Sequence, residues 1–256
     1  MSTVLIEVLD ASTSSNVFTF GDGGWKIYGE IDGLGNITPT ISTIGSVSSY
    51  GVNLTNVSIG ARIINFNVVN TITKNKDTIR DSITSALRPG IEEYILRITY
   101  NDKTRELRKV YLSDYKIAAG NINDFVSASF SFMATDPLFY DTGYKELFFN
   151  GSVYTGSVKN QGSAPALPII RVSGAINDDM TLRLSDKYNI YYKAYKGAVK
   201  SSLSYDLENL EFSDIQSLSS STEISRIFLL PGDLNIECSQ SNLSISVKFR
   251  ERSFGL

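Results

Sequence analysis

The chain has 256 residues, 42% of them hydrophobic, and its 24 Lys and Arg nearly balance its 27 Asp and Glu. This balance argues against a nucleic-acid-binding protein, which usually carries a clustered basic surface. The sequence contains no histidine. Histidine is the usual general base and metal ligand near neutral pH, so its absence excludes Ser-His-Asp and Cys-His catalysis and most zinc and non-haem iron sites. We therefore expect a protein that is not an enzyme and has no metal and no cofactor.

The same sequence shows no targeting or membrane-spanning segment. Met1–Asp10 has no basic start, and Glu7 interrupts its short apolar run. The longest aliphatic stretches, such as Ile227–Leu230, are far shorter than a membrane span. Cys238 is the only cysteine, so no intrachain disulfide can form. We expect a soluble protein, made in a cytoplasm, with no membrane partner.

Alternating apolar and polar residues dominate the N-terminal half. In Val126–Ala134 every second residue is apolar, and serines stand between them. This period of two is typical of antiparallel strands with one buried face. The same pattern predicts strands at residues 64–68 and 96–100, and glycines on both sides indicate a short strand at 25–31.

One helix is predicted, over about residues 75–87. Ile79, Ile83 and Leu87 recur at intervals of four and form one apolar stripe. Asn75 or Asp77 could cap its start, and Pro89-Gly90 ends it. Residues 206–218 could hold a second, shorter helix.

The strongest predicted domain boundary lies at Asp136-Pro137, because proline cannot donate to a sheet and ends the preceding strand. We expect domains at residues 1–137 and 138–256. In the second domain, strands are predicted at residues 147–149, 169–172, 181–184, 189–195, 224–230, 234–238 and 243–250. Many short strands at this spacing are typical of a β-sandwich.

Residue types that could carry chemistry have simpler structural explanations. Cys238 continues the inward face of its strand, where a free cysteine usually packs as a small apolar residue. The glycines of Gly29–Gly35 lack the lysine and the following helix of a phosphate loop. The acidic pairs Asp178-Asp179, Glu92-Glu93 and Glu30 with Asp32 are expected to be solvated residues of turns and strand ends.

Aromatic residues are the better candidates for a functional surface, since the chain has 13 Phe, 14 Tyr and one Trp. Tyrosine is enriched in protein interfaces. Five tyrosines crowd residues 188–205, on both faces of a predicted strand. As assembly-interface candidates we select Trp25, Tyr28, Tyr50, Tyr188, Tyr192 and Tyr205.

An ordered set of short motifs runs almost from end to end of the chain. It comprises I-D-G-L at Ile31–Leu34 with Pro39, G-A-R-I-I-N-F-N-V at Gly60–Val68, S-A-L-R-P at Ser85–Pro89, D-P-L-F-Y at Asp136–Tyr140, the run Asn160–Gly174, L-P-G-D at Leu230–Asp233 and K-F-R-E-R at Lys248–Arg252. In this order the motifs resemble the distal tail protein family of bacteriophages with long, non-contractile tails.

The resemblance implies a mainly β protein with two parts. The N-terminal part would be a belt domain, a helix on a β-sheet, of which six copies close into a ring. The C-terminal part would be a galectin-like β-sandwich. The ring would join the tail tube protein to the tail-tip protein and anchor baseplate or receptor-binding proteins. The protein would be located at the tail tip of the virion, after assembly in the host bacterial cytoplasm.

Three features depart from the family pattern. Ser253-Phe254 stands where members often have tryptophan, the turn after Leu230 is one residue longer, and there is no room for a long arm in the second domain. The galectin likeness does not imply sugar binding, because the chain has no histidine and Trp25 lies in the other domain.

Two other hypotheses remain open. A glycan-binding β-sandwich of a host-adsorption protein would use the tyrosine cluster as a stacking surface. A carboxylate glycosidase would need an acid pair in a cleft, and the sequence alone places none there.

Overall fold

The computed structural model describes residues 4–37, 40–45, 52–72, 75–122, 125–150, 154–176, 180–185, 190–194, 200–206, 211–212, 229–240 and 242–256. The chain divides into two compact units, Met1–Tyr140 with Phe254–Leu256, and Asp141–Ser253. The sequence places the boundary after Pro137, whereas the structure places it after Tyr140, because Phe139 is buried in the core of the first unit. The last three residues also return to the first unit, which therefore contains both ends of the chain.

The first unit is built on one sheet with the strand order β2-β1-β7-β8-β9-β6-β3, and the short strand β10 lies outside this order. The pairs along it are antiparallel. The strands are β1 Val4–Asp10, β2 Asn16–Phe20, β3 Trp25–Asp32, β6 Arg62–Asn70, β7 Tyr94–Tyr100, β8 Lys103–Ile122, β9 Phe125–Ala134 and β10 Phe139–Asp141. The short strand β20, Arg252–Ser253, belongs to the second unit.

The alternation seen in the sequence decides which face of this sheet is buried. Phe66 in β6 lies opposite Phe130 in β9, and both are buried. Their neighbours Asn67 and Ser129 also lie opposite each other, on the other face. Burial of a large apolar side chain stabilises a fold by about 1.5 to 3 kcal/mol, so the apolar rows fix which face turns inward.

Aromatic rings fill the centre of this core. The ring centroid of Phe20 lies 5.0 Å from that of Phe66 and 4.7 Å from that of Phe130. Trp25 meets Phe130 edge-on at 6.4 Å. Such tilted and edge-to-face pairs add stabilisation beyond the area that they bury. The rings join β2, β3, β6 and β9 into one packed unit.

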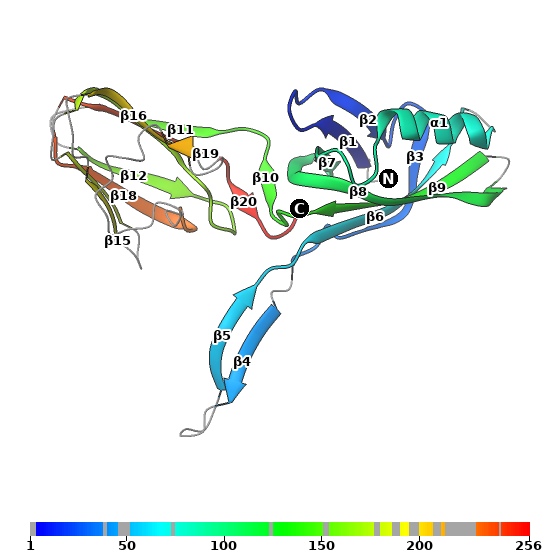
Figure 1. Cartoon of the computed structure of the whole chain (residues 1–256), viewed down its shortest axis with the longest axis horizontal. Helices are drawn as coiled ribbons and strands as arrows, with labels where there is room; N and C mark the ends of the chain where they lie inside the picture. The colour runs from blue at the N-terminus through cyan, green and yellow to red at the C-terminus, as the bar shows by residue number, and fades with distance from the viewer. Residues whose placement is uncertain are drawn as a thin grey trace. The chain divides into compact units, whose positions relative to one another are not determined.

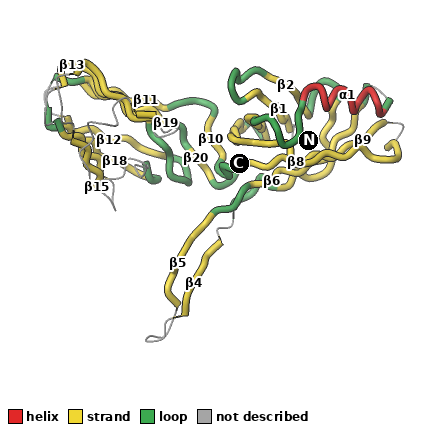
Figure 2. Tube along the Cα trace, viewed as in Figure 1, coloured by secondary structure: helices red, strands yellow, loops and turns green. Residues whose placement is uncertain are grey.

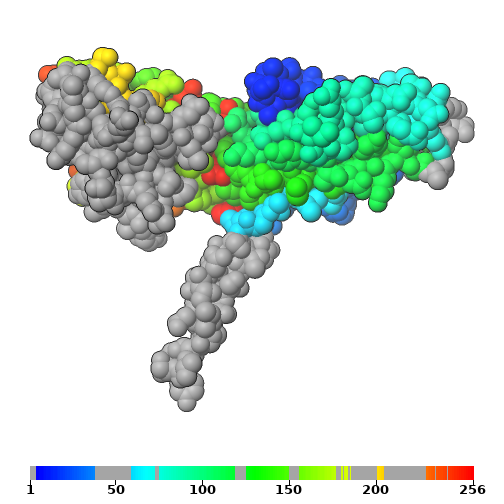
Figure 3. Space-filling view, in the orientation of Figure 1, coloured from blue at the N-terminus to red at the C-terminus, as the bar shows by residue number. Residues whose placement is uncertain are grey.

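The predicted helix is confirmed as α1, Lys76–Ala86, which lies along one side of the sheet (Figure 1). Ile79 and Ile83 are buried in the same core. Asn75, rather than Asp77, is the N-cap, and its side-chain oxygen accepts hydrogen bonds from the N–H groups of Asp77 and Thr78. In Figure 3, residues of α1 form part of the blue-green surface at the upper right. Within the described ranges, no helix is long and apolar enough to cross a membrane.

A separate hairpin lies between β3 and β6 in the chain. It consists of β4, Thr40–Gly45, and β5, Val52–Ser58, which pair antiparallel (Figure 2). Among the described strands, β4 and β5 pair only with each other. The sequence analysis assigned no strand to these residues.

The second unit consists of two sheets, with the orders β11-β19-β13-β16-β17 and β12-β18-β14-β15. Val172 and Val247 from the first sheet share one core with Val158 and Ile236 from the second, which is the arrangement of a β-sandwich. The strands are β11 Lys145–Asn150, β12 Tyr154–Asn160, β13 Ile169–Ile176, β14 Thr181–Ser185, β15 Ile190–Ala194, β16 Lys200–Asp206, β17 Glu211–Phe212, β18 Gly232–Cys238 and β19 Ser244–Phe249.

The mainly β expectation is confirmed, with two local differences. Glu211–Phe212 form a strand that pairs with β16, so the optional helix at 206–218 is wrong at these positions, and most of the remaining residues lie outside the described ranges. Of the strand expected at 224–230, only Leu229 and Leu230 are described, and Leu229 forms an isolated bridge with Ala166.

Candidate assembly surface

Two isoleucines of the first unit are unusually exposed, Ile72 at 75% and Ile91 at 78%. Single exposed apolar residues are common on protein surfaces, so their positions matter more than their number. Both flank regular elements of the sheet and lie outside the core. Among the residues of this unit that the structure describes, the other large, exposed apolar side chains are Tyr28, Ile59, Ile63 and Tyr100.

Ile72 marks one end of the sheet. Its N–H donates to the side chain of Asn70, the last residue of β6, at 2.9 Å. The neighbouring Thr71 N–H donates to Gly24 O at 2.8 Å, just before β3. Gly24 has a φ of +97°, and a Cβ there would run into the Ile72 side chain. A glycine at this position therefore leaves room for Ile72 against the turn.

Ile91 marks the opposite end. It follows the Pro89-Gly90 turn, and the Gly90 N–H donates to Leu112 O at 3.0 Å. Leu112 and Ile64 both lie opposite Phe132, one on each side of β9, so Leu112 is level with the start of β6. Ile64 and the end of β6 are six residues apart, about 20 Å at the rise of an antiparallel strand. The two exposed isoleucines thus lie at opposite ends of the sheet, on two separate surfaces.

A polar hollow of about 350 Å³ lies on the outer face of the sheet, and Glu30, Asp32, Asp114 and Lys116 are among the residues that line it. The acidic pair Glu30 and Asp32 is therefore in a hollow rather than in an isolated turn. Lys116 Nζ lies 3.5 Å from a carboxylate oxygen of Asp114, and both side chains are well exposed. In the part of the chain that the structure describes, no three or more His, Cys, Asp or Glu side chains gather where they could hold a metal ion.

Arg62, the first residue of β6, is a buried cation that organises the loops at this end of the first unit. Its Nε donates to Pro137 O at 2.7 Å, its Nη1 to the carbonyls of Gly33 and Gly35, and its Nη2 to Phe254 O. The guanidinium also lies 4.5 Å from the ring centroid of Phe139. Burial lowers the pKa of Arg62 to about 10, so it stays charged near neutral pH. Only a guanidinium supplies so many donors in one plane.

Among the residues whose carbonyls accept hydrogen bonds from Arg62, Gly33 has no room for a side chain. Its φ is +88°, and a Cβ there would collide with the backbone carbonyl of Ile63. We expect Gly33→Ala to lower the free energy of unfolding by about 2 to 3 kcal/mol, because a left-handed conformation and a backbone clash act together.

Gly23→Ala is the matched control, since Gly23 has a φ of +60° and open space around it. It should lose only about 1 kcal/mol, the cost of the left-handed conformation alone. Urea unfolding followed by the fluorescence of Trp25, the only tryptophan, measures both. Equal losses in the two variants would contradict the clash.

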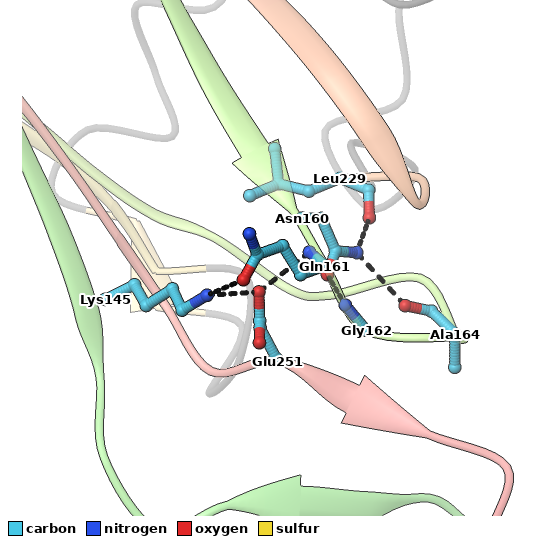
Figure 4. Close-up of polar contacts among 7 residues, drawn as sticks. All are labelled: Lys145, Asn160, Gln161, Gly162, Ala164, Leu229 and Glu251. Carbon is cyan, nitrogen blue, oxygen red and sulfur yellow. Dashed lines mark hydrogen bonds and ion pairs between the residues drawn. The ribbon is translucent and has the colours of Figure 1, made fainter.

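In the second unit, a buried amide holds the segment that follows β12 (Figure 4). Asn160 is 2% exposed, and its Nδ2 donates to Ala164 O at 3.1 Å and to Leu229 O at 2.8 Å. Its Oδ1 accepts from the Gly162 N–H at 3.0 Å. One side chain therefore satisfies three backbone groups from two distant parts of the chain.

Glu251 completes this corner from the C-terminal side (Figure 4). Its Oε1 accepts from Lys145 Nζ at 2.5 Å and from the Gln161 N–H at 2.7 Å. The Glu251 side chain is only 10% exposed, so the lysine offsets a charge that is mostly removed from water. These contacts connect β11, the segment after β12 and the residues after β19.

The other chemically reactive groups have structural partners. Glu92 and Glu93 accept hydrogen bonds from the hydroxyls of Tyr94 and Tyr111, each at 2.9 Å. Burial raises the pKa of Tyr94, and the bond to Glu93 raises that of Tyr111. Cys238 is partly buried against the second core, and burial raises the pKa of its thiol. Asp178-Asp179 lies outside the described residues.

Of the six interface candidates from the sequence, Trp25 and Tyr28 lie in the first unit and Tyr192 and Tyr205 in the second. Trp25 packs at the edge of the aromatic core, and Tyr28 is 40% exposed on the edge strand β3. Tyr50 and Tyr188 lie outside the described residues. Tyr192 and Tyr205 belong to β15 and β16. Their role in assembly stays a prediction.

Sequence reasoning missed the two isoleucines and also Phe148, which is 64% exposed on β11. A signal was present for Ile91, a lone apolar residue between a Pro-Gly turn and two glutamates.

No protein family model and no curated protein match the sequence. Among solved structures, the chain is similar to Dit (gp 19.1) of phage SPP1, described as a paradigm of the hub adsorption apparatus in phages that infect Gram-positive bacteria. The TM-score is 0.67 at 17% identity, with 96% of this chain and 98% of that chain covered. A chain of the phage P2 baseplate in its activated conformation matches with a TM-score of 0.52, 11% identity and full coverage of both chains. The resemblance in the sequence is therefore confirmed at the level of architecture, and the chain has the fold of the phage distal tail protein.

Proposed function

We propose that the protein is the structural hub at the distal tip of a phage tail. Six copies would form a ring through the first unit, the belt domain. The ring would join the tail tube protein to the tail-tip protein and anchor baseplate or receptor-binding proteins. The second unit would be a galectin-like docking platform without enzymatic activity. The protein would act in the virion, after assembly in the bacterial cytoplasm.

The observation that carries this proposal is the fold match to SPP1 Dit, which extends over 96% of the chain. The separation of the two exposed isoleucines supports it independently. A ring of identical copies needs two different surfaces on each copy, since the contact is head-to-tail. Ile72 and Ile91 place an exposed apolar residue at each end of one sheet, and two such separate surfaces are compatible with a head-to-tail contact.

Complementing variants test the ring. Ile72→Asp damages one surface and Ile91→Asp the other, so each variant alone should remain monomeric. An equimolar mixture keeps one intact pair of surfaces and should form dimers that cannot grow further. Mass photometry measures the species, and negative-stain electron microscopy shows whether the wild-type protein forms six-fold rings.

Thr84→Asp on the exposed side of α1 is the control substitution, and its rings should match those of the wild type. Rings formed by both isoleucine variants would rule out these two surfaces. A wild-type protein that forms no ring, alone or with tail components, would contradict the hub itself.

A further inference from the structure

The segment between Asp32 and Arg62 contains no Asp, Glu, Lys or Arg, although 20% of the chain's residues are charged. The next longest uncharged stretch, Leu147–Val158, is less than half as long. This uncharged segment contains the hairpin of β4 and β5. Exposed strand edges are normally protected from unwanted pairing by charged residues, lysine above all. The hairpin lacks that protection.

The pairing of the hairpin leaves its two outer edges open to a partner. β4 and β5 pair with each other from Thr40 opposite Ser58 to Gly45 opposite Val52. Neither strand pairs with any other strand in the part of the chain that the structure describes. A two-stranded hairpin by itself is at best marginally stable in water, and further strands stabilise it.

We propose that β4 of one copy pairs with β5 of the neighbouring copy, so that hairpins from successive subunits form a continuous sheet. This inference rests on the ring of the proposed function. The two open edges of one hairpin differ, so their contact is head-to-tail and can close in the same way as the ring.

The missing charges favour a second copy over a different protein as the partner. In a sheet of identical hairpins, equivalent residues of neighbouring copies lie two strands apart, about 10 Å, so a charge on the hairpin is repelled by the same charge on both neighbours. A different protein could carry the opposite charge, so an interface with it would not exclude charged residues. An uncharged segment avoids this repulsion and therefore favours pairing between identical copies.

A charge-swap experiment on the full-length protein tests this inference. One variant carries Asn53→Lys and Asn56→Lys, and a second carries Asn53→Glu and Asn56→Glu; both positions lie in β5. Replacing one polar residue with another changes little in a hairpin that faces water. In paired hairpins each variant alone should need at least about tenfold more protein for half-maximal ring formation. An equimolar mixture should form rings at the wild-type concentration, since the two variants can alternate.

Ser157→Lys and Ser157→Glu are the matched controls, because Ser157 is exposed on β12 of the second unit. Ring formation should be unchanged in both. Wild-type rings from the lysine variant alone would overturn the hairpin pairing and leave the proposed hub intact. A mixture that assembles no better than its components would also overturn it. Absence of rings from the wild type would overturn the hub and this inference together.

Discussion

Replacing Arg62 with alanine is expected to lower the free energy of unfolding of the first unit by about 3 to 5 kcal/mol. The substitution removes every donor that the guanidinium gives to the carbonyls of Gly33, Gly35, Pro137 and Phe254. Those carbonyls are left without the charged partner that satisfied them. The contact with the Phe139 ring is lost as well. Urea unfolding followed by Trp25 fluorescence reports this change, because Trp25 belongs to the first unit.

Two further variants separate the loss of the charge at Arg62 from the loss of its hydrogen bonds. Arg62→Lys keeps the charge but cannot reach all the carbonyls at once, so its loss should fall between that of alanine and zero. Arg80→Ala is the matched control, since Arg80 forms an exposed ion pair with Asp77 on α1. Such pairs contribute roughly 0.3 to 0.5 kcal/mol on helices. A loss below about 1 kcal/mol for Arg62→Ala would show that the buried guanidinium does not hold these loops.

Asn160→Asp is expected to lower the free energy of unfolding of the second unit by about 3 to 5 kcal/mol near neutral pH. The carboxylate replaces an N–H₂ group that donates to Ala164 O and Leu229 O. Two carbonyl oxygens then face a buried negative charge. The change is nearly isosteric, so packing is preserved and only the hydrogen bonding and charge differ.

The stability of the Asn160→Asp variant should also depend on pH. Burial and the facing carbonyls raise the pKa of the new carboxyl in the folded state above its unfolded value. The protonated form is therefore less damaging, and the stability defect should grow as the pH rises through the folded pKa. Hydrogen exchange of the β12 and β18 amides should speed up in the variant, while the Trp25 unfolding transition stays in place. Asn235→Ala, at an exposed site on β18, is the control.

The sequence by itself determined the elements whose signals are local. The alternation in Val126–Ala134 predicted β9, and the spacing of Ile79, Ile83 and Leu87 predicted α1 to within a residue at either end. These predictions succeeded because the side-chain period of a strand or helix is written in consecutive residues. The absence of histidine likewise removed whole classes of chemistry without any structure.

Only the tertiary structure decided which distant residues meet. Arg62 looked like an ordinary charged residue at the start of a strand, yet its acceptors lie 75 residues away at Pro137 and 192 away at Phe254. Asn160 and Leu229 are 69 residues apart. The return of Phe254–Leu256 to the first unit and the separate pairing of β4 with β5 were equally hidden. No local periodicity encodes such contacts, because they depend on the three-dimensional path of the chain, which the packing of both cores sets.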